Sequence, residues 1–544
     1  MTDSTVLHNR THPDWYWTTT NASEAIPGVL TPLGWTLWGP CGEQAMRRVF
    51  HKIGGLPASA LAMPSDPRDL IINVFHGRIA INVDTFVRIG NAMPGAKGVD
   101  LAHQMLGYVP DELPTDTAWR RYPVVLAKFP PAFVRMPARA QRLCDETDRW
   151  YRAVVARVDG LDLDSARAMF RDARARFDEA VYVQTLTTTT GIQPIFQQLT
   201  ALAERAGVEA GTLMVGHGSH AESRLVADLW ECSRGRLDLD VVASRYGYHG
   251  PGEGHVSGTV WRQDPGPLER VVRTYRELPE DRDPALESAR NTAARRAAEQ
   301  QLLASLDPLR RAAARLTLRL AARYLPLRGG CKGAFLQSLD VCRAAAARIG
   351  ALLVAGGRLG EIDDVYYLTC DELLGPLPDD PATVVKARRE ERDRYLEVDL
   401  PAAWRGDPEP LVPVPAEGAR ATRFSGVGVS GGRASGPARV VLDPSDVDME
   451  VGDVLVARTT DPSWASVMYP ASALIVEVGG QLSHAAVVAR ELGIPCVMGV
   501  PGATAGIRDG ELVRVDGSAG TVELVRVDGG AGTVEMPGSP EAGS

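Results

Sequence analysis

Cysteine is scarce in this chain of 544 residues, which contains seven, and no two of them are spaced as a CxxC pair. An odd, scattered set of thiols predicts neither a disulfide framework nor a zinc site. It favours reduced cysteines, as in a cytoplasmic protein, and we expect that location. We expect no metal site in this chain.

Three further absences narrow the class of protein. Basic residues are not in excess, since 59 Lys and Arg face 68 Asp and Glu for a net charge of −9, which argues against nucleic-acid binding. No run of about 18 apolar residues occurs, so no membrane span is expected. The first residues lack a basic region followed by an apolar one, so no secretory leader is predicted. What remains, 44% hydrophobic and 23% charged residues, is typical of a globular protein of about two to four domains.

Residues 1–400 are predicted to form a mostly α-helical substrate domain. Apolar residues recur there at spacings of three and four among Ala, Arg and Glu. The clearest such stretches are 138–157, 164–181, 285–324 and 334–354. Five prolines then crowd residues 401–418, so we expect a stiff, exposed linker over 401–424.

Residues 425–535 are predicted to form a compact α/β domain of ordinary size. Short apolar runs bounded by Gly, Pro and Asp predict strands, and patches of helix formers lie between them. The strands are expected at 438–442, 453–457 and 473–478, and the helices at 463–469 and 484–492.

A near-perfect repeat lies close to the C-terminus. Residues 511–522 and 523–534 share almost the same sequence, and each unit predicts a hairpin with an Asp-Gly turn. Two copies are too few for a solenoid, so we interpret them as a local duplication. Residues 536–544 are predicted to be a disordered tail.

The most informative stretch runs from Gly479 to Pro495. The pair Gly479-Gly480 allows a tight turn, and Ser483-His484 then opens a run of helix formers. Free N–H groups and the positive end of the helix dipole favour an anion at such a position. Because a neutral imidazole is a good nucleophile and a good leaving group, the pattern predicts that His484 becomes phosphorylated.

The same stretch resembles the phosphohistidine signature of the phosphoenolpyruvate-utilising enzymes. These include phosphoenolpyruvate synthase, pyruvate phosphate dikinase, rifampin phosphotransferase and phenylphosphate synthase. The resemblance extends over 425–535, through the motifs that begin at Gly432, Gly452, Thr459 and Val515. It implies a swivelling phosphohistidine domain, with Gly479, Gly480 and Ser483 as its phosphate loop and His484 as its catalytic residue.

The opening stretch, residues 15–35, combines aromatic rings with hydroxyl, amide and carboxylate groups. Such a mixture suits a pocket with apolar walls and a few polar anchors. It resembles the start of the acceptor domain of rifampin phosphotransferase and phenylphosphate synthase, although buried tryptophans beside a helix cap would look the same. The candidate substrate-binding residues are Asn21, Glu24, Thr31 and Trp35.

Three later patches resemble the same acceptor domain: 245–254 with 261–265, 325–332, and 363–369. Related chains often show His-Arg at Tyr248-His249 and Arg-Glu at Arg328-Gly329, so this chain lacks a carboxylate at 329.

Arg328 and Lys332 are the candidate catalytic cations of these patches, because they would neutralise a phosphoryl group during transfer. His249 and Glu253 are further candidate substrate-binding residues. We expect Glu24, Glu253 or His249 to accept the acceptor's proton. For each of these residues, the alternative to a functional role is an ordinary surface charge or a cation at the end of a helix.

Two other polar patterns carry less weight. His217 and His220 lie three apart, but Gly218 makes a helical metal site unfavourable and no third ligand is evident. The glycines of 426–432 lack the Gly-Lys-Ser/Thr ending of a nucleotide-binding loop.

Full-length relatives also carry an ATP-grasp domain that loads the histidine, and this sequence shows none. The resemblance therefore implies the split arrangement of phenylphosphate synthase. A separate ATP-grasp subunit would bind ATP and Mg²⁺ and place a diphosphate on His484. Phosphate would leave, and phospho-His484 would pass its phosphoryl group to the acceptor, giving AMP and phosphate.

The aromatic residues of the opening stretch favour a phenolic or other bulky aromatic hydroxyl acceptor. Two alternatives stay open. The chain could be a non-catalytic phosphocarrier or binding protein, with Tyr248 and Gly329 as marks of decay. It could also be a phosphoenolpyruvate synthase-like enzyme acting on a small acceptor, although the barrel domain of that type is not visible after the histidine domain.

Overall fold

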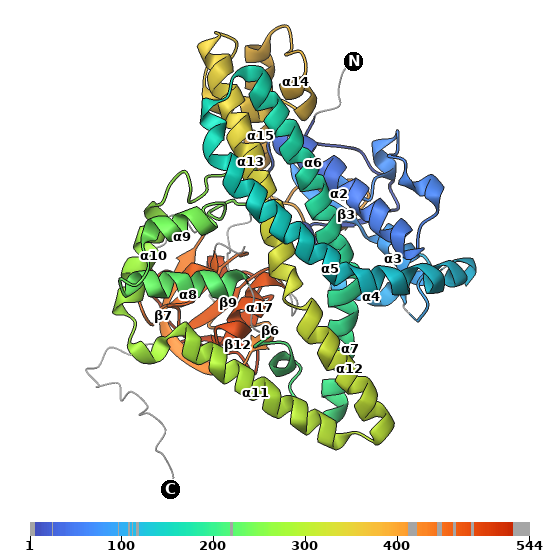
Figure 1. The fold of residues 1–544 in the computed structure, drawn as a ribbon, viewed down its shortest axis with the longest axis vertical. Coiled ribbons are helices and arrows are strands. Elements are labelled where there is room, and N and C mark those ends of the chain that lie inside the picture. The colour runs from blue at the N-terminus through green and yellow to red at the C-terminus, as the bar shows by residue number, and fades with distance from the viewer. Residues whose placement is uncertain are drawn as a thin grey trace.

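The computed structural model describes residues 6–23, 26–95, 97–106, 109–110, 112–115, 119–217, 221–411, 421–442, 449–460, 464–479 and 483–525. A large helical region is followed by an α/β region, which confirms the predicted fold class (Figure 1). The predicted tail and most of the second repeat copy lie outside the described residues. Every helix in the described ranges is too short or too polar to cross a lipid bilayer.

Helix α13 (Leu327–Ala355) is the centre of the helical region. It packs against α5 (Tyr122–Val154) and α6 (Leu163–Thr187), and most of its side chains are buried. The periodic stretches of the sequence therefore form the predicted helices. The other helices of this region are α1 (Thr20–Ser23), α2 (Pro32–Ile53), α3 (Val83–Asn91), α4 (Gly98–Leu106), α7 (Gln193–Ala206), α8 (Ala221–Ser233), α9 (Leu239–Tyr246), α10 (Gly266–Glu277), α11 (Pro284–Ser305), α12 (Pro308–Tyr324), α14 (Cys370–Leu374) and α15 (Pro381–Leu396).

A small antiparallel sheet, in the order β2-β3-β1-β4, lies beside these helices. Its last strand, β4 (Ala403–Arg405), falls in the predicted linker and pairs with β1 (Tyr16–Thr18). Trp404 is buried there and packs edge-on against Phe75. The prediction of an exposed linker therefore fails for these residues, because burial of an indole outweighs the exposure that prolines favour. The other two strands are β2 (Ile72–Phe75) and β3 (Arg78–Asn82), and residues 412–420 of the linker lie outside the described residues.

The α/β region is built on an eight-stranded sheet in the order β5-β12-β11-β7-β8-β9-β10-β6. Its four middle strands, from β7 to β10, are parallel, and the rest pair antiparallel. The predicted strands and the first repeat hairpin are present. The strands are β5 (Arg423–Ser425), β6 (Val427–Ser430), β7 (Arg433–Val441), β8 (Val454–Ala457), β9 (Ala473–Val476), β10 (Cys496–Met498), β11 (Leu512–Asp516) and β12 (Thr521–Leu524).

Both faces of the sheet are buried at strands β8, β9 and β10, which explains the continuous apolar runs of these strands. Val454 and Val456 of β8 face a core closed by β11 and α18 (Ala503–Gly506). Leu455 and Ala457 face the other side, where α16 (Ala465–Met468) and α17 (His484–Glu491) lie.

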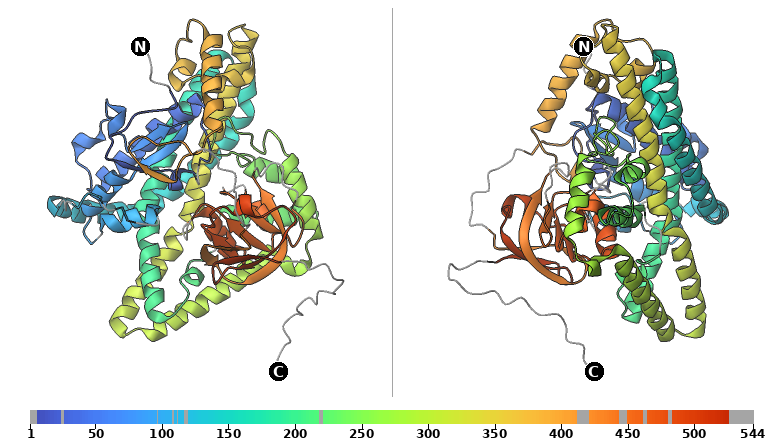
Figure 2. Two further views of the ribbon diagram at one scale, coloured as in Figure 1. Left: turned by 180° about the vertical axis from the view of Figure 1, so that it is seen from behind. Right: turned by 60° about the vertical axis from the view of Figure 1, so that its left-hand side comes forward.

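Helices α8 and α10 extend this second core. Leu229 and Trp230 of α8 and Tyr275 of α10 belong to the same cluster of buried side chains as Leu455 and Leu474 of the sheet. Figures 1 and 2 show the green helices lying against the orange sheet. The Tyr275 hydroxyl donates to the carbonyl of Ser466 at 3.0 Å. The α/β region is therefore docked on α8–α10 through a shared hydrophobic core.

Candidate functional site

Helix α17 begins with His484, as the sequence predicts. Ser483 caps it, since its hydroxyl accepts from the Ala486 N–H at 3.2 Å. Gly479 has a φ of 140°, and a side chain there would bring its Cβ within 2.4 Å of the Met498 methyl group. The structure thus shows a capped helix start at this histidine, and Gly479 before it has a backbone conformation that favours glycine. The structure describes neither Gly480 nor the His484 side chain.

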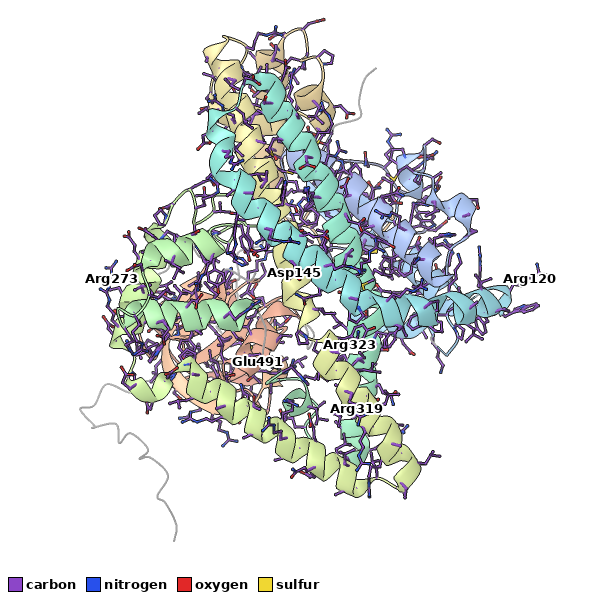
Figure 3. The ribbon with its side chains drawn as sticks, in the orientation of Figure 1. Arg120, Asp145, Arg273, Arg319, Arg323 and Glu491 are labelled. Atoms are coloured by element: carbon purple, nitrogen blue, oxygen red, sulfur yellow. The ribbon has the colours of Figure 1, made fainter. Side chains whose placement is uncertain are left out.

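The far end of α17 is tied to the helical region. The Asn291 side chain of α11 donates to the carbonyl of Glu491 at 2.7 Å. The Glu491 carboxylate accepts from the Gly216 N–H at 3.3 Å. Figure 3 shows Glu491 on the side of the sheet that faces α11. These contacts hold the histidine-bearing helix in one orientation relative to α11.

Arg328 lies in the first turn of α13, close enough to Arg490 of α17 for their charges to interact. Burial lowers the pKa of Arg490, and the nearby positive charge of Arg328 lowers it further. Arg490 lies on α17 and donates to the carbonyl of Val429 at 2.6 Å. The electrostatic coupling of the two guanidiniums shows that the predicted acceptor cation and the histidine helix belong to one region of the molecule.

Lys332, one turn further along α13, meets the predicted loop residues. Its Nζ lies 3.9 Å from Oε1 of Glu253, and Oε2 of Glu253 lies 2.6 Å from Nδ1 of His249. The Glu253 side chain is 1% exposed, and its Oε1 accepts no hydrogen bond among the described residues. The Lys332 side chain is 18% exposed. The structure thus brings together three residues predicted from the sequence, since His249 and Lys332 both lie against the buried carboxylate of Glu253.

The loop that carries Glu253 is anchored by two hydrogen bonds to the N-terminal part of the chain. Trp38 of α2 donates to the carbonyl of Gly254 at 2.8 Å. The Nε2 of His255 lies 2.6 Å from the carbonyl of Pro27, and burial lowers the pKa of His255 to about 4. The imidazole is therefore neutral at pH 7 and donates this hydrogen bond. The opening stretch and the later patches, distant in sequence, meet at this loop.

Two predicted residues of the opening stretch have structural contacts. The Thr31 hydroxyl caps α2 by accepting from the Gly34 N–H at 3.2 Å. Trp35 is buried in the helical core. Asn21 lies in α1, where the structure does not describe its side chain, and Glu24 lies outside the described residues. A contact of these four residues with an acceptor stays a prediction.

The sequence did not point to a buried charge network behind this loop. Asp340 of α13 accepts two hydrogen bonds of 3.0 Å from Arg262 and one of 2.8 Å from the Tyr151 hydroxyl. Arg343 donates to Asp340 and, at 3.1 Å, to the carbonyl of Glu253. Burial alone would raise the pKa of Asp340, but these partners hold it below its ordinary value. The signal available in the sequence was the pair Asp340 and Arg343, an acid and a base three residues apart within the apolar run 334–354.

The histidine pair at 217 and 220 is described only in part. His217 Nε2 lies 3.1 Å from the carbonyl of Leu213, whereas His220 lies outside the described residues. In the part of the chain that the structure describes, no group of three His, Cys, Asp or Glu side chains is arranged to hold a metal ion.

Two family models match parts of the chain. Residues 449–520 match the PEP-utilising enzyme, mobile domain, and residues 197–329 match the rifampicin phosphotransferase fourth domain. The first match contains His484, and the second contains His249, Glu253 and Arg328.

Several proteins are similar to this chain. A rifampicin phosphotransferase of a Streptomyces species is 36% identical over 305 residues, which make up 52% of this chain and 34% of that protein. The rifampicin phosphotransferase of Bacillus subtilis is 30% identical over 298 residues, 52% of this chain and 33% of that protein. An uncharacterised protein of Mycobacterium tuberculosis is 34% identical over 277 residues, 51% of this chain and 30% of that protein. The chain thus spans about a third of the length of these relatives. The capped helix at His484 thus lies within the segment of the chain that matches the mobile domain of the PEP-utilising enzymes.

Proposed function

We propose that this chain is the histidine-bearing and acceptor-binding part of an ATP-dependent phosphotransferase. His484 carries the phosphoryl group, and the loop around Glu253 with the first turns of α13 receives the acceptor. The observation that carries the proposal is the capped helix at His484 within the mobile-domain match, in a fold that also brings Lys332 against Glu253. That relatives include rifampicin phosphotransferases supports the same chemistry.

In the transfer step, the acceptor oxygen attacks the phosphorus of phospho-His484. The P–N bond breaks as the new P–O bond forms, and the hydroxyl proton must leave the acceptor. Arg328 and Lys332 neutralise charge on the phosphoryl oxygens. Glu253 accepts the proton, because its buried Oε1 is the carboxylate oxygen adjacent to Lys332. This carboxylate takes the place of the one that position 329 lacks.

The acceptor is proposed to be a phenol or another bulky aromatic hydroxyl compound. This rests on relatives named for rifampicin and on the aromatic opening stretch, in which the carbonyl of Pro27 contacts His255 of the Glu253 loop. A separate ATP-grasp subunit is proposed to bind ATP and Mg²⁺ and to load His484. The reaction is proposed to take place in the cytoplasm.

The proposal is tested by acceptor titration of the phosphorylated chain. The chain is loaded with an ATP-grasp partner and ATP labelled in the β-phosphate, freed of nucleotide, and mixed in turn with a phenol, rifampicin or pyruvate. We expect label to pass to an aromatic hydroxyl compound. Label that passes only to pyruvate supports the small-acceptor alternative. A phosphorylated chain that returns its phosphate only to a protein partner supports the carrier alternative.

A further inference from the structure

The carboxylate of Asp340 has no part in the transfer step described above, yet three segments of the chain meet at it. It accepts hydrogen bonds from Tyr151 of α5, from Arg262 and, within α13, from Arg343. The side chains of Asp340 and Arg343 are 0% and 1% exposed, so both charges are held inside the protein. Arg262 closes the loop of residues 247–262, which contains Glu253.

Stability alone does not account for this network. A buried ion pair adds little to the free energy of unfolding, because the loss of hydration of the two charges offsets their attraction. Well-packed apolar side chains stabilise a helix interface at least as well. A guanidinium does provide direction, because its N–H groups point along a rigid, planar fork. The atoms that accept from the two arginines therefore show what the network holds in place.

Arg343 holds the middle of the loop. Its Nη2 donates to the carbonyl of Glu253 at 3.1 Å and to the carbonyl of His255 at 2.7 Å. Its Nη1 donates to Asp340 at 2.9 Å. One planar group thus attaches α13 to the loop backbone at the residue whose carboxylate lies against Lys332.

Arg262 holds the end of the loop. Its Nε and Nη2 each donate to the carboxylate of Asp340 at 3.0 Å. Its backbone N–H donates to the carbonyl of Gly247 at 2.9 Å, and the N–H of Trp261 donates to the carbonyl of His249 at 2.8 Å. These bonds pair the two ends of the loop. The loop is therefore attached to Asp340 both directly at its end and through an arginine at its middle.

We propose that Arg343 and Arg262 are positioning residues, which act on the transfer step through Glu253. Both are held by Asp340, which lies on the same helix as Lys332, about two turns further along. Helix α13 thus carries the cation and also the anchor of the loop, and it sets the separation between Lys332 and the Glu253 carboxylate. The inference rests on the proposed function, in which Glu253 accepts the proton of the acceptor.

The effect on transfer is measured by single-turnover discharge of protein loaded at His484. Arg343→Lys retains a positive charge beside Asp340 but loses the fork that reaches two carbonyls. We expect discharge at saturating acceptor to slow by about 10²-fold, the scale of a displacement of about 1 Å at a reacting group. The acceptor concentration that gives the half-maximal rate should stay at its wild-type value. Arg348→Lys is the matched control and should discharge normally, since Arg348 of α13 donates to a distant carbonyl, that of Leu161, at 2.7 Å.

A double substitution separates positioning from a purely structural role. In Glu253→Gln the proton acceptor is already absent, so Arg343→Lys has no carboxylate left to misplace. We expect the double variant to discharge at the rate of Glu253→Gln alone. A residue that serves only the stability of the fold would slow both backgrounds alike. An equal slowing by Arg343→Lys in the wild-type and Glu253→Gln backgrounds therefore overturns the proposal.

The attachment of the loop is tested without any assay of activity. The N–H groups of Glu253 and His255 donate within the loop at 3.0 and 2.8 Å, and native-state hydrogen exchange reports how firmly they are held. Both amides should exchange faster in Arg343→Lys and at the wild-type rate in Arg348→Lys. Wild-type exchange in Arg343→Lys overturns the proposal.

A second variant covers the case in which the buried Arg343 cannot be replaced. Arg262→Lys, at a side chain that is 27% exposed, should also speed exchange of the loop amides and slow discharge. If it changes neither, the proposal is wrong. A wild-type discharge rate in Glu253→Gln would instead count against the proposed function, and the exchange of the loop amides would still decide whether the two arginines hold the loop.

Discussion

The Nζ of Lys332 lies 3.9 Å from Oε1 of Glu253, a carboxylate that is almost fully buried and that also contacts His249. Burying a charged group is costly unless it is paired. The two partners reduce that cost, and they hold the carboxylate next to the cation proposed to meet the phosphoryl group. Gly329, where related chains carry a carboxylate, lies in the same turn of α13 as Lys332.

Replacement of Lys332 should slow phosphoryl transfer from His484 to the acceptor and leave the phosphorylation of His484 unchanged. Lys332→Met retains much of the side-chain length but removes the charge that neutralises the phosphoryl oxygens. We expect discharge of phospho-His484 by the acceptor to slow by about 10²-fold or more, the scale of losing one such electrostatic contact. Single-turnover discharge of labelled protein measures this rate. Lys386→Met, at a lysine that is 79% exposed, is the matched control and should behave as wild type. A normal rate in Lys332→Met removes this residue from the mechanism.

Replacement of Glu253 tests its role as proton acceptor. Glu253→Gln preserves the shape of the side chain and its contact with His249, but an amide cannot take the hydroxyl proton. We expect discharge to a phenol to slow by about 10²-fold or more, while labelling of His484 stays normal. Glu253→Asp should recover part of the rate, because it restores a carboxylate. If Glu253→Gln discharges at the wild-type rate, the proton acceptor is another group.

The half-buried imidazole of His255 should make stability depend on pH. Its pKa in the folded chain is about 4, against about 6.5 in the unfolded chain. The contribution of His255 to the free energy of unfolding is complete above about pH 6.5. It is lost as the pH falls toward about 4, because in this range the unfolded chain binds a proton at His255 and the folded chain does not. The loss amounts to roughly 3 kcal/mol.

Denaturant unfolding at several pH values measures this effect. His255→Gln retains an N–H donor for the Pro27 carbonyl but does not titrate, so its stability should fall less between pH 6.5 and 4 than that of wild type. His12→Gln, at a histidine that is 36% exposed, should keep the wild-type dependence. Equal slopes for wild type and His255→Gln would show that this imidazole is not held neutral.

Because α8 and the α/β region share one hydrophobic core, a substitution in α8 should lower the local stability of the α/β region. Leu229→Ala leaves a cavity in the cluster that contains Leu455 and Leu474, with an expected cost of about 2–5 kcal/mol. Native-state hydrogen exchange should show faster exchange of the β8 and β9 amides. Leu199→Ala, an equally buried change in the other core, should leave these amides protected. Unchanged exchange in Leu229→Ala would mean that the two parts unfold independently.

Local patterns in the sequence were enough to predict most single elements. The apolar run of β8 and the Ser483-capped start of α17 depend on near neighbours, and both are present where expected. Contacts between distant segments were not predictable in this way. The pairing of β4 with β1 and the burial of Trp404 overrode the proline-rich pattern of 401–418. The ion pair of Asp340 with Arg262 likewise depends on residues that only the fold brings together.

The sequence predicted the residues of the site one by one, and the structure showed which of them lie together. His249, Glu253 and Lys332 were named from the resemblance, but nothing in the sequence indicated that the Glu253 carboxylate contacts the side chains of both His249 and Lys332. Thr31 has a local explanation as a helix cap, which a sequence pattern cannot separate from a substrate anchor.

Phosphorylation of His484 is the central claim, and isotope labelling tests it most directly. The chain is incubated with an ATP-grasp partner and ATP labelled in the β-phosphate, and label on the protein is counted after acid and after base treatment. The account predicts that wild type gains an acid-labile, base-stable phosphate and that His484→Ala gains none. Equal labelling of His484→Ala and wild type would contradict it.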